Sequence, residues 1–197
     1  MCIIRLLRKS VMVLLLLTGG FLLAESGWIY AKAELAQKLI EQAWGETLDT
    51  GLRVKPWPWA DTWPVGRLQS EKEEVDLFVL NGTEGNALAF APGLMIGSAQ
   101  PGEQGVTIIA GHRDTHFRFM ARVQQGDSLQ LINRTGQRMQ YVVQAVYIVD
   151  SRNQALTTAS EHHQLLLVTC YPFKATETGG PLRYVVSAKL ERDTMYM

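Results

Sequence analysis

Short apolar runs separated by turn residues make up most of the chain from residue 75 onwards. Some runs alternate apolar and polar positions and others are continuously apolar, and glycine, proline or asparagine commonly follows them, which is typical of strands joined by turns. The predicted strands lie at residues 75–80, 87–91, 106–110, 128–132, 137–149, 164–169 and 182–190. Seven or eight short strands in about 120 residues, without long helices between them, predict a mainly β domain, either a small antiparallel-rich barrel or a sandwich.

The N-terminus has a different pattern. The first ten residues carry three basic side chains, and residues 11–24 then run for fourteen positions without a charge. This length fits the core of a signal peptide, with residues 31–33 as a cleavage site, or a membrane span that tolerates Glu25 and extends to Tyr30. The pattern favours an uncleaved anchor over residues 1–30. The basic residues before the span predict a cytoplasmic N-terminus and an extracytoplasmic domain, on the periplasmic side of an inner membrane.

Residues 31–70 connect this segment to the β domain. Apolar residues lie on one helical face over positions 31–44, which predicts an amphipathic helix, and Gly45 is a plausible stop. Residues 55–64 contain three prolines and three tryptophans, too much proline for a helix or a central strand. We expect an extended leader whose large side chains hold it against the β domain, which we place at residues 71–197.

Composition limits the classes of partner. A chain of 197 residues with 47% hydrophobic content suits one domain plus an accessory segment. The net formal charge is zero, which argues against a nucleic-acid surface.

The chain has two cysteines, Cys2 and Cys170. The predicted orientation places them on opposite sides of the membrane, so they should not pair. A single unpaired cysteine in an exported domain indicates a reactive thiol, although a free cysteine is often a small core residue instead.

Three predicted strands carry reactive side chains at their ends. The apolar run at 164–169 leads to Cys170 and is stopped by Pro172, which has no N–H to donate. A second strand ends at Gly111 and His112, and a third begins beside Arg183. Together they offer a thiolate nucleophile, a proton carrier and a fixed cation for a developing oxyanion.

This set resembles the sortase family. The sequence Leu166-Leu167-Val168-Thr169-Cys170 is similar to the family's Thr-Leu-x-Thr-Cys signature, with leucine in place of the first threonine. Residues 110–117 and the Tyr171-Pro172-Phe173 sequence are most similar to the compact Gram-negative and class D sortases. The resemblance covers residues 75–190.

The resemblance implies a closed eight-stranded β-barrel with short helices and a membrane-anchored cysteine transpeptidase that needs no cofactor. Its partners would be a protein with a C-terminal Leu-Pro-x-Thr-Gly type sorting signal and an amine acceptor. Cys170 would form a thioester, Arg183 would stabilise the oxyanion, and His112 would transfer protons. Thr169 would orient the strand end and Asp114 would orient His112. The loops at 151–163 and 174–180 would border the substrate groove.

Two alternatives concern the residues of the site. His112 and His116 are four residues apart, and a zinc site could use them with His162, His163 or Cys170. That spacing places both on one face only in a helix, whereas a strand pattern precedes His112, and position 113 lacks the glutamate of a metalloprotease motif, so we predict no metal. Arg113 and Arg152 are the alternatives to Arg183 for the cation.

Two alternatives concern the function. A cysteine peptidase would use the same groups and pass the acyl group to water. A non-catalytic, membrane-tethered β module would bind partners through its tryptophan-rich segment, and Cys170 would then be core packing.

Overall fold

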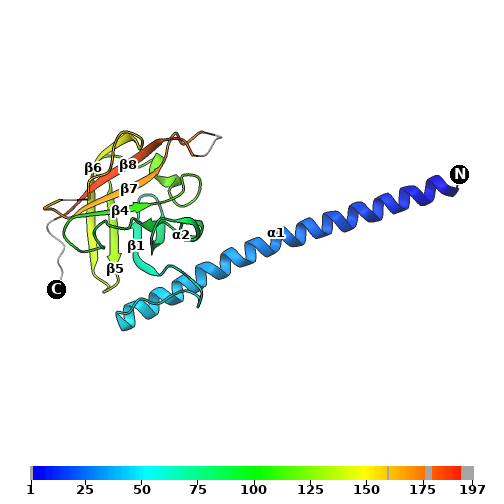
Figure 1. The fold of residues 1–197 in the computed structure, drawn as a ribbon, viewed down its shortest axis with the longest axis horizontal. Coiled ribbons are helices and arrows are strands. Elements are labelled where there is room, and N and C mark those ends of the chain that lie inside the picture. The colour runs from blue at the N-terminus through cyan, green and yellow to red at the C-terminus, as the bar shows by residue number, and fades with distance from the viewer. Residues whose placement is uncertain (1, 159, 176–178, 192–197) are drawn as a thin grey trace. The chain divides into compact units, whose positions relative to one another are not determined.

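The computed structural model describes residues 2–158, 160–175 and 179–191, and the chain divides into two compact units, residues 1–38 and 39–197. The elements in chain order are α1 (Cys2–Thr50), β1 (Pro64–Ser70), β2 (Val75–Asn81), α2 (Gly85–Phe90), β3 (Gly93–Leu94), β4 (Val106–Ala110), the 3-10 helix η1 (Arg118–Ala121), β5 (Ser128–Asn133), β6 (Arg138–Asp150), β7 (Gln164–Cys170) and β8 (Leu182–Leu190) (Figure 1).

The first unit consists of the N-terminal part of α1. The segment Val11–Thr50 contains an 18-residue window with a mean hydropathy of 1.7, none of which is buried. A helix of this length and composition is apolar enough to cross a membrane, as the sequence predicted for its N-terminal segment.

The helix does not stop at Gly45, and this prediction was wrong. It continues for one more turn, in which Thr47 is buried and its Oγ1 donates to the carbonyl of Ala43 at 2.7 Å. The helix ends instead at Thr50. The next residue, Gly51, has a φ of +70° and donates its N–H to the carbonyl of Thr47 at 2.8 Å. Glycine adopts this left-handed conformation without a Cβ penalty, so it is the usual residue after a helix.

The second unit contains a closed barrel of eight strands. Its order is β1-β2-β3-β4-β7-β8-β6-β5, and β5 pairs back with β1. The pairs are antiparallel except for β2 with β3 and β4 with β7, which are parallel. The predicted closed barrel is therefore confirmed.

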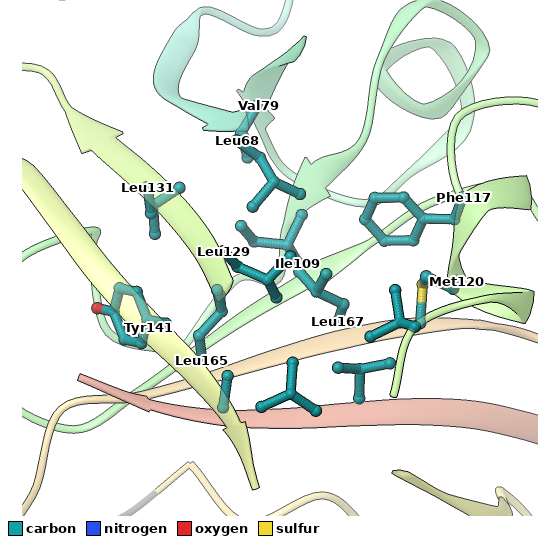
Figure 2. Close-up of a cluster of buried hydrophobic side chains, with 14 of the residues drawn as sticks. Leu68, Val79, Ile109, Phe117, Met120, Leu129, Leu131, Tyr141, Leu165 and Leu167 are labelled. Carbon is teal, nitrogen blue, oxygen red and sulfur yellow. The ribbon is translucent and has the colours of Figure 1, made fainter. Parts of the chain in front are cut away.

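The barrel interior is the main hydrophobic core. Figure 2 shows side chains from several strands and from the segment before β5 meeting there, and each labelled residue is at most 1% exposed: Leu68, Val79, Ile109, Phe117, Met120, Leu129, Leu131, Tyr141, Leu165 and Leu167. On β7 the inward residues are Leu165 and Leu167. Because successive side chains of a strand point to opposite faces, Leu166, Val168 and Cys170 lie on the outer face.

Two parts of the strand prediction were wrong. Residues 85–90 form α2, where a strand was expected at 87–91, because a short apolar run containing Ala87, Leu88 and Ala89 fits a buried helix turn as well as a strand. The barrel begins with β1, in a stretch that the sequence analysis assigned to the leader. Leu68 of β1 is fully buried in the barrel. A turn of only four residues connects β1 to β2.

The leader packs against α2 through Trp57. The centroid of its ring lies 5.1 Å from that of Phe90, and the two rings meet edge-on at an interplanar angle of 72°. This contact agrees with the predicted clamping role for one of the tryptophans. Trp59, in contrast, is 83% exposed.

Candidate active site

Three strand ends bring the predicted catalytic residues into one row. Cys170 on β7 pairs directly with Arg183 on β8. On the other side of β7, Ala110 of β4 pairs with Val168, so continuing this parallel register by two residues places His112 beside Cys170. Neighbouring strands are about 4.8 Å apart. Cys170 and Arg183 thus lie opposite each other on β7 and β8, and His112 lies two residues past the end of β4, on the other side of β7.

The thiol lies at the end of this row and not in the core. Cys170 is a free cysteine of intermediate exposure. Five buried residues of β7, four apolar ones and then Thr169, precede it, so the strand is held in the core while its last side chain remains accessible. This position agrees with a nucleophile and not with core packing.

Apolar side chains cover the outer face behind the row. Val106, Ile108, Leu166, Val168 and Val185 form a second buried cluster, with Met95, Val149 and Leu156 packed against it. Beside it is an open cavity of about 440 Å³, lined by Tyr147, Ile148, Val149, Gln154, Ala155, Leu156, Thr157, Gln164 and Leu166. The predicted wall at 151–163 thus borders this face. Residue 159 and the middle of the second predicted wall, residues 176–178, lie outside the described residues.

Thr169 links the strand of the thiol to the turn of the histidine. It is 2% exposed, and its Oγ1 donates to the carbonyl of Gly111 at 2.7 Å. Gly111 in turn donates its N–H to the carbonyl of Val168 at 3.1 Å. A Cβ added at Gly111 would lie 2.9 Å from the Phe117 ring, so only glycine lets the chain pass this close to the core. The backbone just before His112 is therefore held against β7.

His112 is exposed, and two ionisable neighbours lie within electrostatic range of it. A hydrogen bond from Arg113 is the main cause that lowers the pKa of Asp114, and the charges of Arg113, Arg118 and His112 lower it further. Both carboxylate oxygens of Asp114 accept from Arg113, at 2.8 Å each. Asp114 thus contributes charge near His112 while its hydrogen bonds go to Arg113. The pKa of His116 lies below its usual value, because burial lowers it most and the charge of His112 lowers it further. A hydrogen bond with the Phe90 backbone offsets part of this effect.

Arg183 uses only one of its three guanidinium nitrogens for hydrogen bonds to described residues. Its Nη1 donates to the carbonyls of Gly180 and Leu182, at 2.5 and 3.0 Å. A guanidinium has five N–H donors, and within the described part of the chain the three on Nε and Nη2 have no protein acceptor. This leaves a fork of donors on the side chain that neighbours the thiol.

Of the two alternatives to Arg183, Arg113 bonds the segment after Cys170. Arg152 forms an ion pair with Asp150 at 2.6 Å and has a side chain that is 70% exposed. His163 Nδ1 lies 3.0 Å from the carbonyl of Glu103, and His162 is exposed. Across residues 2–158, 160–175 and 179–191, no group of three or more His, Cys, Asp or Glu side chains is arranged to hold a metal ion.

Two features of the site were not predicted from sequence. Arg113 is 6% exposed and bonds the segment after Cys170, and the rings of Tyr171, Phe173 and Tyr184 pack together beside β7 and β8. Tyr171 stacks on Tyr184 with centroids 6.0 Å apart. The sequence signals were the position of these residues next to His112, Cys170 and Arg183, and the similarity of residues 110–117 and 171–173 to class D sortases.

Comparison with known proteins identifies the family. A family model described as "Sortase domain" matches residues 68–191. Sortase D of Bacillus subtilis (strain 168) is 31% identical over 124 residues, which are 63% of this chain and 62% of that protein. The chain therefore spans less than two thirds of that relative's length.

Solved structures agree on the fold. A Sortase D5 transpeptidase of Clostridium perfringens has a TM-score of 0.64 at 22% identity, over 80% of this chain and 99% of that one. The catalytic domain of B. anthracis SrtD has a TM-score of 0.55 at 27% identity, over 65% of this chain and 87% of that one. With a family model that matches more than half of its residues, this chain belongs to the sortase family, and its similarities are to the class D type.

Proposed function

We propose that this chain is a cysteine transpeptidase that cleaves a C-terminal sorting signal of the Leu-Pro-x-Thr-Gly type and transfers the acyl part to an amine. The proposal rests on the pairing of Cys170 with Arg183 on neighbouring strands, and on the register of β4 with β7, which supports a place for His112 on the other side of Cys170. Family membership supports the reaction class.

The first half of the reaction makes a thioester. The Cys170 thiolate attacks the carbonyl carbon of the signal's threonine, forming a C–S bond and moving an electron pair to the carbonyl oxygen. The free donors of Arg183 stabilise this oxyanion. As the intermediate collapses, the C–N bond breaks, and protonated His112 gives its proton to the leaving amine.

The second half reverses these steps with a new amine. The acceptor attacks the thioester carbon, neutral His112 takes a proton from it, and collapse of the second oxyanion breaks the C–S bond. The products are a new amide and the free thiolate. The side chains before the threonine would lie in the open cavity beside the second buried cluster. The apolar lining of this cavity includes Ile148, Leu156 and Leu166 and suits a leucine-proline pair.

Hydrolysis is the second candidate, because His112 is exposed and water could reach the thioester. We expect that adding an amine will divert most of the acyl flux from hydrolysis to amide product without slowing peptide cleavage. The measurement is product analysis by mass spectrometry with a sorting-signal peptide, with and without an amino-terminal glycine peptide. Cleavage that gives only the free acid at every amine concentration would assign the chain as a peptidase.

We also propose that residues 1–30 are an uncleaved anchor, with the barrel on the extracytoplasmic side of the inner membrane. The apolar stretch of α1 and the basic residues before it support this orientation. The expected result is that the full-length chain fractionates with membranes at its full mass, and that external protease digests the barrel of spheroplasts. A soluble form beginning near Glu34 would instead identify residues 31–33 as a cleavage site.

A further inference from the structure

Arg113 is a buried cation next to an exposed histidine. Its side chain is 6% exposed, whereas that of its ion-pair partner Asp114 is 63% exposed. Burying a guanidinium is costly unless its donors are satisfied, so its partners are informative about its role.

The guanidinium joins two parts of the site. Towards its own turn, Nε and Nη2 each donate to one carboxylate oxygen of Asp114. Towards the segment after the thiol, Nη1 donates to the carbonyl of Pro172 at 2.7 Å and Nη2 to that of Ala175 at 2.9 Å. Four of its five donors are thus directed, two to each part.

The segment after Cys170 has few backbone bonds of its own. Proline has no N–H, and the described bonds are those from Tyr171 to the carbonyl of Leu182 at 3.0 Å and from Ala175 to that of Pro172 at 3.2 Å. Among the described residues, Arg113 therefore supplies two of the four hydrogen bonds that attach residues 171–175 to the barrel or to one another.

We propose that Arg113 is a positioning residue that ties the segment after Cys170 to the histidine turn, so that His112, Cys170 and Arg183 keep their spacing during the reaction. It acts through backbone carbonyls and does not contact the substrate. The charge of the thiol is one of the causes that raise the pKa of Arg113, after its hydrogen bond to Asp114, which agrees with their proximity. Lysine keeps the charge but lacks the planar fork that reaches both carbonyls and the carboxylate.

The test is Arg113→Lys, measured by amide hydrogen exchange and by peptide kinetics. We expect exchange to become about tenfold faster or more in peptides covering residues 171–175, and to stay unchanged in β4, β5 and β6. We also expect kcat to fall about tenfold or more with KM within about threefold, because misplaced reacting groups slow the chemistry and the apolar face is intact. The kinetic arm rests on the proposed function, whereas the exchange arm needs no substrate and is valid without it.

Arg67→Lys is the matched control, since it makes the same change in a two-bond Arg–Asp pair, with Asp76, on β1 and β2, which carry none of the three catalytic candidates. It should leave exchange at 171–175 and kcat unchanged. If Arg113→Lys does not fold, Asp114→Asn is the milder variant, because it weakens only one side of the fork, and it should speed exchange at 171–175 in part. Exchange at 171–175 as slow as in the parent, or faster exchange throughout the barrel, would overturn the proposal.

Discussion

Cys170→Ala is expected to abolish the reaction and the covalent intermediate together while the barrel stays folded. Removing the sulfur removes the group that holds the acyl part, and Cys2, the other cysteine, lies in the N-terminal helix. The measurement is intact-mass spectrometry of the chain from about residue 31 onwards, incubated with a sorting-signal peptide and no amine. The parent should gain the mass of the peptide up to its threonine, on Cys170, and hydroxylamine should release it.

His112→Ala is the informative partner of this variant. It should lose about 10²–10⁴-fold in activity, the usual contribution of a proton-transfer group, and should keep a thiol that iodoacetamide alkylates in the folded state. Thr169→Ala should lose less, because it removes one hydrogen bond that holds the Gly111 backbone. An amide product formed equally by Cys170→Ala would remove the transpeptidase proposal and leave the fold unaffected.

The positions of the three catalytic candidates could be predicted because each one follows or begins an apolar run. The run before Cys170 has the length of one buried strand, and Pro172 marks its end, so the thiol had to emerge at a barrel rim. Alternation along β7 then separates the core side chain Leu167 from its outward neighbours. What alternation cannot give is which strands are neighbours, and the family resemblance implied only that eight strands close into a barrel.

The contacts that hold the site depend on that unknown order. Arg113 meets Pro172 and Ala175 across about sixty residues of sequence, and no local periodicity encodes such a contact. The same applies to Thr169, whose hydroxyl bonds Gly111 through the parallel pairing of β4 with β7. Errors in α2 and at Gly45 have a different origin, because both concern local elements whose packing outweighs their propensity.

The supporting bonds place the site on rigid elements. Gly111 is fixed by Thr169 and by β7, and the Phe117 N–H donates to the carbonyl of His112 at 3.0 Å, so the histidine is held on both sides. Arg183 is itself part of β8 and pairs with Val149 on one side and Cys170 on the other. Among the described residues no acceptor meets its Nε and Nη2, which is where a developing negative charge would be stabilised.

Arg183→Lys is expected to fold normally and to lose about 10²-fold or more in kcat, the size of effect that follows the loss of one oxyanion donor. Lysine keeps the charge, but its ammonium cannot both replace the bonds to the Gly180 and Leu182 carbonyls and present a fork towards Cys170. The measurement is the rate of thioester formation in a single turnover, which isolates the step in which the first oxyanion develops. Hydrogen exchange at residues 171–175 should stay at the parent's rate, because the bonds from Arg113 remain, and this separates the variant from Arg113→Lys. An Arg183→Lys variant as fast as the parent would show that local charge is enough, and would move the oxyanion role to Arg113 or Arg152.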